Sequence, residues 1–101
     1  MNLLFFTPHA ALWPHTAPEA YLARGLAECG HTISYLTCGK AQTYCAPMTA
    51  RRLAPGCKAE ESARICSDCK AGADAIARVY RFPVDALARY LTEADLAKFN
   101  D

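Results

Sequence analysis

Residues 3–37, LLFFTPHAALWPHTAPEAYLARGLAECGHTISYLT, carry the pattern from which the fold is predicted. It opens with a short continuous apolar run, Leu3–Thr7, which Pro8 ends. Such a run is typical of a strand that is covered on both faces of a parallel sheet. Residues 32–37 are rich in β-branched and aromatic side chains and predict a second strand. With a helix between the two strands, residues 1–38 predict a right-handed βαβ unit.

The helix between the strands has recognisable ends. Thr16 and Glu19 have the spacing of a capping box, and Pro18 is tolerated in a first turn. The helix is expected to reach about Cys29, where Gly30 follows and can end it with a positive φ. The apolar face of this helix is predicted to carry Leu22, Leu26 and Cys29.

The remainder of the chain divides into an irregular part and a helical part. Residues 38–70 form a Cys-rich insertion, and its first portion, 38–58, has little periodicity. Residues 71–101 are predicted to be a helical segment. Only two strands are visible, and a two-stranded sheet is marginal without further partners. We therefore expect an α/β fold with a Rossmann-like βαβ start, present as an incomplete domain.

Three helices are predicted after the irregular segment. The first covers about 59–80, because apolar side chains recur there at helical spacing. Pro83 interrupts it, a short helix follows over 84–91, and Thr92 with Asp95 marks another helix start. The stripe of the first helix consists of Ile65, Cys69, Ala73, Ile76 and Tyr80.

Composition excludes several classes of protein. The 101 residues are 52% hydrophobic and 21% charged, with a formal net charge of +1, which fits one small globular domain. Without a basic stripe we expect no nucleic-acid partner. No apolar run approaches the roughly 20 residues that a membrane span needs. The start lacks a basic leader, so we expect a cytoplasmic protein with no membrane span.

The cysteines are the most specific chemical signal. In a reducing cytosol the six cysteines point to metal ligation, redox chemistry or plain burial. Cys38, Cys45, Cys66 and Cys69 are predicted to form a four-thiolate site for structural zinc, because soft thiolates surround this ion tetrahedrally. Cys57 could replace Cys45 in this site, and the sequence does not choose between them.

The cysteines also have interpretations other than zinc binding. Several could be buried small hydrophobic residues, and Cys29 on the apolar helix face is interpreted in this way. The spacing matches neither ferredoxin pattern, which disfavours an iron–sulfur cluster. A redox role for the Cys66-x-x-Cys69 pair is disfavoured too, because the pair falls within the helical stripe and no strand leads directly into it.

Residues 8–33 resemble the start of bacterial glycosyltransferases of the two-Rossmann-lobe type, above all those of capsule and surface-polysaccharide biosynthesis. The signature is a helix that ends in Leu26-x-x-x-Gly30-His31 before an apolar strand. With the cysteines and the segment 90–95, the resemblance covers nearly the whole chain. A glycine-rich G-x-G-x-x-G loop is missing, which argues against NAD or FAD.

The resemblance implies that this chain is the N-terminal lobe of an enzyme that moves a sugar from a nucleotide donor to a glycan or lipid-linked acceptor. In such enzymes the second lobe holds most of the nucleotide sugar. The missing C-terminal lobe is therefore an expected partner, and the chain by itself is expected to be inactive.

The loop after the first strand holds the candidate catalytic residues. In an open α/β sheet this loop lies at the carboxyl edge of the strands, where ligands bind. A neutral His there can accept a proton from an acceptor hydroxyl, as the resemblance also implies. His15 is predicted to be this base, with His9 and Trp13 as substrate-binding residues. The alternatives are a surface or capping role for the histidines and plain packing for Trp13.

A second function from another class is also consistent with the sequence. The chain could be a small zinc-stabilised α/β module that binds a partner without catalysis. A reading frame that continues past Asp101 into another Rossmann-like half would favour the transferase. A stop after Asp101 would favour the binding module.

Overall fold

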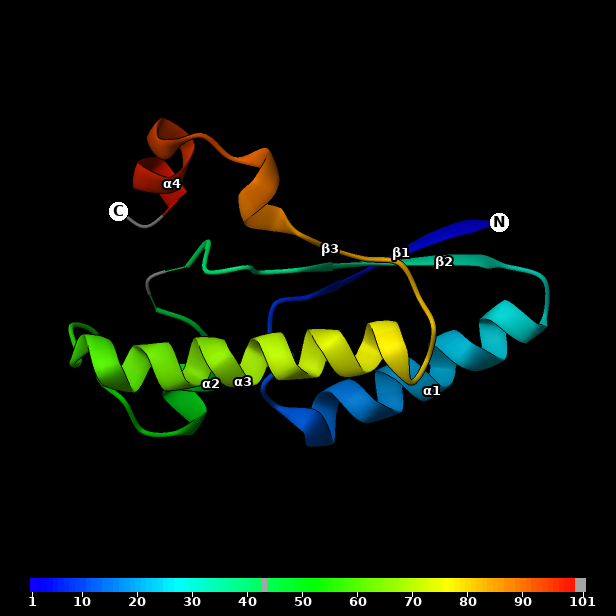
Figure 1. The fold of residues 1–101 in the computed structure, drawn as a ribbon, viewed down its shortest axis with the longest axis horizontal. Coiled ribbons are helices and arrows are strands. Elements are labelled where there is room, and N and C mark those ends of the chain that lie inside the picture. The colour runs from blue at the N-terminus through cyan, green and yellow to red at the C-terminus, as the bar shows by residue number, and fades with distance from the viewer. Residues whose placement is uncertain (43, 100–101) are drawn as a thin grey trace.

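The structure is a computed structural model that describes residues 1–42 and 44–99. The chain forms a mixed α/β unit in which strands and helices largely alternate (Figure 1). Its elements in chain order are β1 (Asn2–Thr7), α1 (Trp13–Glu28), β2 (Thr32–Thr37), α2 (Ala46–Ala50), α3 (Ala59–Arg78), β3 (Val84–Ala86), the 3-10 helix η1 (Leu87–Tyr90) and α4 (Glu93–Phe99).

The strands form one parallel sheet in the order β1-β2-β3. Asn2 pairs with Thr32 and Thr7 with Thr37, so β1 and β2 run in register along their whole length. The predicted βαβ unit is confirmed. Parallel pairing also places the carboxyl ends of all three strands at one edge of the sheet.

The third strand corrects one prediction. Residues 84–91 were expected to be a short helix, yet Val84–Ala86 pairs with β2 and only Leu87–Tyr90 is helical. The pairing begins where the Tyr35 N–H donates to the Pro83 carbonyl over 2.9 Å. Three residues are too few to show an alternating pattern, so tertiary pairing decided their conformation.

Both long helices, α1 and α3, cover the same face of the sheet (Figure 1). Successive crossovers of one hand that step in the same direction produce this arrangement. The opposite face is only partly covered: Leu4 is 65% and Phe6 51% exposed. The prediction that the first strand is covered on both faces is therefore wrong, and β1 alternates between an inner and an outer side.

The core lies between the sheet and the two long helices. Three aromatic rings stack through it, with centroid separations of 5.3 Å for Phe5–Tyr35 and 5.7 Å for Tyr35–Phe82. The Arg24 guanidinium lies 5.1 Å from the Phe82 ring centroid and donates to the Tyr80 carbonyl over 3.0 Å. The fully buried members of this core cluster are Ala23, Ile33, Tyr35, Ile76 and Phe82.

The start of α1 corrects the predicted capping box. The helix begins at Trp13, and its N-cap, Leu12, makes no side-chain cap. Thr16 lies inside the helix, and its buried hydroxyl donates to the carbonyls of His9 and Leu12. The helix starts earlier than predicted because the Leu12 carbonyl already accepts the N–H of His15 and of Thr16. Pro14 is tolerated there because the first turn needs no N–H from it.

The face of α1 that meets the sheet is built from small residues. Thr16, Ala20 and Ala23 are buried, and Leu26 packs against the core cluster. Leu22, in contrast, is 59% exposed, and Cys29 is exposed at the C-cap. The predicted burial of these two is therefore wrong, because small side chains let the helix approach the sheet along another face. Gly30 does take a positive φ, of 96°.

Other predicted elements are close to the observed ones. The helix predicted over 59–80 is α3, which ends at Arg78. The irregular segment after β2 contains the short helix α2. The predicted helix start at Thr92 is confirmed, because its N–H donates to the Asp95 carboxylate over 3.0 Å and Asp95 N–H returns a 3.1 Å bond to its hydroxyl.

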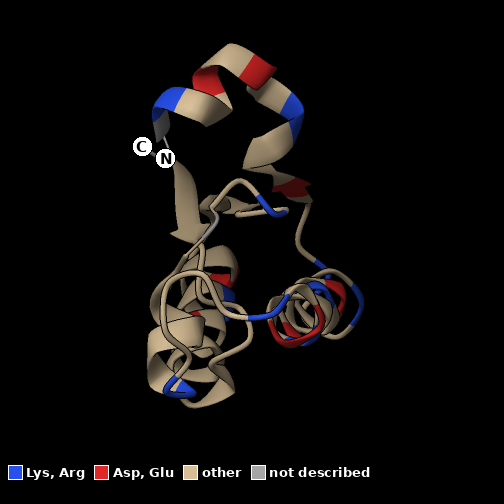
Figure 2. Cartoon of the chain, turned by 90° about the vertical axis from the view of Figure 1, so that its left-hand side faces the viewer, with Lys and Arg blue, Asp and Glu red and all other residues tan. Residues whose placement is uncertain are grey.

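Charges are interspersed along the chain. Figure 2 shows blue basic and red acidic segments mixed on the helices. Within the described part of the chain, no helix is both long and apolar enough to cross a membrane.

The backbone of α3 lies close to the loop after β1. Gly72 is buried in α3, and a Cβ added there would overlap the carbonyl oxygen of Ala10. Only glycine allows the helix backbone to lie against this loop.

We expect Gly72→Ala to lower the free energy of unfolding by about 1–3 kcal/mol, because the new methyl group must move α3 away from the loop. Gly25→Ala in α1 is the matched control, since no atom lies within 4 Å of its added Cβ. That change should stabilise the protein by up to about 1 kcal/mol through helix propensity. Chemical denaturation of both variants measures the difference, and equal effects would contradict the close approach.

Tyr35 provides a test of the core by pH. Burial, followed by the charges of Glu19 and Tyr80, raises the pKa of Tyr35 to about 12, and its buried hydroxyl has no hydrogen-bond partner in the described part of the chain. The folded state therefore holds this proton more tightly than the unfolded state. The resulting stability is complete below pH 10 and is lost as the pH rises toward 12.

We expect Tyr35→Phe to remove this alkaline loss while leaving the protein at least as stable at pH 7, because a buried unpaired hydroxyl is costly. Urea unfolding at pH 7, 10 and 11.5 measures it, with Tyr21→Phe as the exposed control. A Tyr35→Phe protein that loses as much stability above pH 10 as the native chain would contradict the burial of this phenol.

Candidate functional site at the carboxyl edge of the sheet

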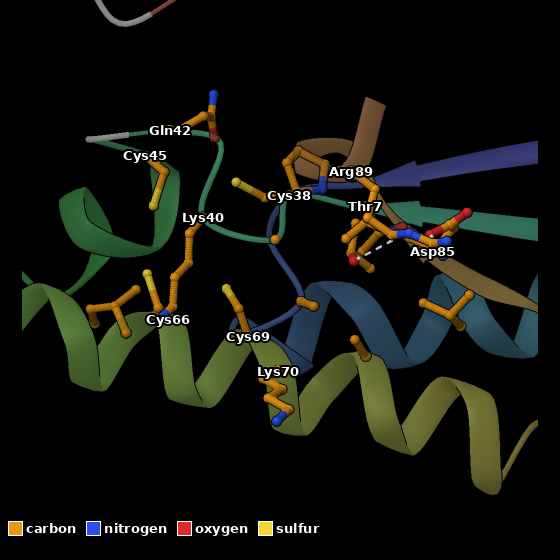
Figure 3. Close-up of a pocket in the computed structure, with 18 residues that line it drawn as sticks. Thr7, Cys38, Lys40, Gln42, Cys45, Cys66, Cys69, Lys70, Asp85 and Arg89 are labelled. Carbon is orange, nitrogen blue, oxygen red and sulfur yellow. Dashed lines mark hydrogen bonds and ion pairs between the residues drawn. The ribbon is translucent and has the colours of Figure 1, made fainter. Parts of the chain in front are cut away.

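A cavity of about 370 Å³ lies at the carboxyl edge of the sheet (Figure 3). The last residue of each strand lines it: Thr7 of β1, Thr37 of β2 and Ala86 of β3. Helix α3 contributes the opposite wall through Ile65 and Ala73 among others. This is the edge at which open α/β sheets bind ligands.

Four cysteines line this cavity, and they are the four predicted metal ligands. Cys38 directly follows β2, and Cys45 is the N-cap of α2. Cys66 and Cys69 lie one turn apart on α3, with their sulfur atoms toward the cavity (Figure 3). The fold thus brings together two pairs that are more than twenty residues apart in the sequence. We call these four residues the thiol cluster.

The other two cysteines lie elsewhere. Cys57 is half-buried and does not line the cavity, and Cys29 is exposed at the end of α1. The geometry therefore favours Cys45 over Cys57 as the fourth member of the cluster. All six cysteines are free thiols.

Burial dominates the chemistry of the two thiols on α3. It raises the pKa of Cys66 and of Cys69. The positive charge of Lys40 acts against this for Cys66, and a hydrogen bond from the Ala11 backbone acts against it for Cys69. A redox-active thiol needs the opposite shift. These pKa directions give no support to a redox role for the pair.

As the side chains lie, no three His, Cys, Asp or Glu residues among positions 1–42 and 44–99 are arranged to hold a metal ion. The thiol cluster surrounds a cavity rather than a point, so its members would have to close in on an ion. Zinc binding at the cluster stays a prediction.

Lys40 is a neighbour of the cluster that the sequence did not single out. It lies in a turn whose residues Gly39 and Lys40 both have positive φ, of 61° and 69°. A Cβ added at Gly39 would come within 2.6 Å of the Ala86 Cβ, so β3 holds this turn in place. The Lys40 side chain extends from the turn toward Cys66 (Figure 3).

A second group of polar residues lies at the carboxyl end of β1. The buried Thr7 hydroxyl donates to the Glu19 carboxylate, and the other oxygen of Glu19 lies 3.7 Å from His9 Nε2. Both His9 and Glu19 are partly exposed, at 28% and 24% of their side-chain surfaces. These two contacts connect Thr7, Glu19 and His9 into one polar group.

The remaining predicted site residues are nearer to solvent. His15 is exposed in the first turn of α1, and Trp13 is 38% exposed at the helix start. Neither these two nor His9 lines the thiol-lined cavity. Of the three, only His9 has an ionic partner in the described residues.

Sequence reasoning missed Glu19, Thr7 and Lys40 as members of these groups. Glu19 has capping-box spacing from Thr16, which concealed its contact with residues of the preceding loop and strand. Only the glycine before Lys40 indicated a turn that could direct a side chain.

Comparison with known proteins finds no matching family model, no matching curated protein and no matching solved structure. The functional conclusion therefore depends on the geometry of the site and on the resemblance carried by residues 8–33.

Proposed function

We propose that this chain is the N-terminal, acceptor-side lobe of a glycosyltransferase that uses a nucleotide sugar. The three-stranded parallel sheet with both crossover helices on one face is compatible with the Rossmann-like start of such a lobe. The Leu26-x-x-x-Gly30-His31 signature supports the same family. The missing C-terminal lobe would hold most of the nucleotide donor, so the chain alone is expected to be inactive.

The exposed side of the sheet supports the proposed incompleteness. Parallel sheets are normally covered on both faces. Here Leu4 and Phe6 leave more than half of their surfaces exposed. Further elements of the same enzyme would cover these side chains, and this is where we expect additional chain to pack.

The observation that carries the proposed chemistry is the Thr7–Glu19–His9 chain at the carboxyl end of β1. His9 would accept the proton of the acceptor hydroxyl as this oxygen attacks the anomeric carbon. A carbon–oxygen bond then forms to the acceptor, and the bond to the nucleotide phosphate breaks. Glu19 would stabilise the imidazolium that results, and Thr7 would hold Glu19 in position.

This assignment differs from the base predicted from sequence. His15 was favoured because it lies close to the predicted helix start, but its side chain is exposed. His9 lies in the same loop and faces a carboxylate at 3.7 Å, which supports it as the base. Trp13, partly exposed beside the loop, remains a proposed contact for the acceptor sugar.

In the enzyme that contains this lobe, we expect His9→Gln to lower kcat by about 10²–10⁴-fold, the usual range for loss of a general base. His15→Gln is the matched control and should stay within a few-fold of the native enzyme. Glu19→Gln should lower kcat by a smaller factor while the KM for the nucleotide sugar hardly changes. The measurement is steady-state release of nucleoside diphosphate with an acceptor present.

Two results would contradict this assignment. If His15→Gln loses the activity and His9→Gln keeps it, the prediction from sequence is right and the geometric one is wrong. If both variants remain active, neither histidine is the base.

A second candidate function is a small zinc-stabilised α/β module that binds a partner without catalysis. The thiol cluster favours it, because a metal site can stabilise a small domain without any enzymatic role. Translation of the genomic frame past Asp101 separates the two functions. A second Rossmann-like half supports the transferase, and a natural stop supports the module.

A further inference from the structure

We propose that Lys40 belongs to a metal site formed by Cys38, Cys45, Cys66 and Cys69, where its ammonium group offsets the negative charge of a four-thiolate zinc centre. The four ligands were predicted from the sequence, and the cationic partner comes from the fold. The proposal is independent of sugar transfer.

Cys38, Cys66 and Cys69 lie in parts of the fold that are held by packing or by backbone hydrogen bonds. Cys66 and Cys69 project from the same side of α3, a helix that packs against the core through Ile65 and Ile76. Cys38 follows the central strand, and its carbonyl accepts the N–H groups of Ala41 and Ala88 over 3.3 Å each. As they lie, these side chains do not surround one point, so binding of an ion requires the four sulfur atoms to close in on it.

The side chains that line the cavity favour a soft metal ion. Its immediate wall beside the thiols is apolar, with Ile65, Ala73 and Ala10 among the lining residues. Asp85, the acidic residue in the lining, is engaged by Arg89 at 2.8 Å and by the Tyr90 hydroxyl. Sulfur ligands without a free carboxylate suit zinc rather than magnesium or calcium. Four protein ligands make the site a closed, structural one.

The charge of such a centre needs a partner. Four thiolates and one Zn²⁺ ion carry a net charge of −2, which is costly to place in a partly buried, apolar cavity. Three cationic residues line the cavity: Lys40, Lys70 and Arg89. Arg89 is paired with Asp85, and Lys70 extends from the outer side of α3 (Figure 3). Lys40 is the one whose side chain extends from its turn toward the sulfur of Cys66.

The backbone at Lys40 is a second, independent observation. A non-glycine residue with a φ of 69° is uncommon and costs free energy. Arg52 and Arg81 also have positive φ, but they lie in the turns that follow helices α2 and α3, where this conformation is usual. Lys40 follows a strand instead, and β3 holds the preceding glycine against Ala86. The strained turn therefore directs a positive charge into the thiol cluster.

The centre would fasten the segment 38–58 to α3. Among the described residues, Arg51 of this segment pairs with Asp68 of α3, and the two side chains are 44% and 46% exposed. Exposed ion pairs of this kind contribute little. Metal binding, in contrast, acts as folding free energy, because the four ligands come together only in the folded chain.

The test is zinc titration of the reduced, metal-free protein, read by native mass spectrometry and by competition with a chromophoric chelator. We expect one zinc per chain and a denaturation midpoint that rises with zinc. Cys66→Ser and Cys69→Ser should abolish both effects. Cys29→Ser and Cys57→Ser are matched controls outside the cavity and should behave like the native chain.

Lys40 is tested by comparing Lys40→Gln with Lys70→Gln, which removes a positive charge from the same cavity. Loss of an outer partner of a metal site lowers affinity by about 10- to 100-fold, and we expect this for Lys40→Gln. Lys70→Gln should change the affinity by less than about threefold. Lys40→Arg should restore most of the loss, because it keeps the charge, and added salt should narrow the difference.

Several outcomes would overturn the proposal. A folded protein that binds no zinc and keeps six reactive thiols excludes the metal site. A bound iron–sulfur chromophore after anaerobic purification replaces zinc by a cluster. Equal affinities of the Lys40→Gln and Lys70→Gln variants exclude the role of Lys40. None of these measurements involves His9 or a sugar, so failure here leaves the proposed transferase untouched, and the reverse also holds.

Discussion

The contact between Gly72 and the backbone of Ala10 is the constraint on which the site depends. It sets how closely α3 lies to the loop that leaves β1, because any side chain at position 72 would overlap the Ala10 carbonyl. Cys69 lies one turn before this glycine and receives a hydrogen bond from the next loop residue, Ala11. The same close approach thus positions the thiols of α3 over the carboxyl edge of the sheet.

The core explains why this edge is well defined while the other face of the sheet is not. Phe5 of β1, Tyr35 of β2 and Phe82, which precedes β3, stack on one another, and stacked aromatic contacts add to the free energy of burial. No comparable cluster exists on the outer face among the described residues, where Leu4 and Phe6 remain exposed. The half of the fold that is well packed is therefore the half that carries the candidate site.

Two groups with different chemistry lie beside each other at this edge. The thiol cluster is apolar, partly buried and suited to a soft cation, whereas His9 and Glu19 are polar and open to solvent. Thr7 connects them, because it ends β1, lines the cavity and donates to Glu19. A structural metal that made the cavity more rigid would also make the end of β1 more rigid. The loop that carries His9, the proposed base, begins at this strand end. The cysteines would then stabilise the fold, and His9 with Glu19 would transfer the proton.

The amino-acid sequence was sufficient to predict the βαβ start, the helix end at Gly30, a helix over about 59–80, observed to end at Arg78, and the capping pair at Thr92 and Asp95. Each of these follows from local periodicity or local hydrogen bonding, which a short window of residues contains. It also indicated that Cys38, Cys66 and Cys69 could act together, but it left Cys45 and Cys57 as alternatives for the fourth member, and the cavity lining favours Cys45.

Only the tertiary structure decided the third strand, the start of α1, the exposure of Cys29 and Leu22, and the neighbours Lys40 and Glu19. The strand Val84–Ala86 exists because β2 offers it a parallel edge, and Glu19 faces His9 because the fold places this part of α1 beside the end of β1 and the loop that follows it. These features depend on which segments pack together. Contacts between residues far apart in the chain produce no periodic pattern in the sequence from which they could be predicted.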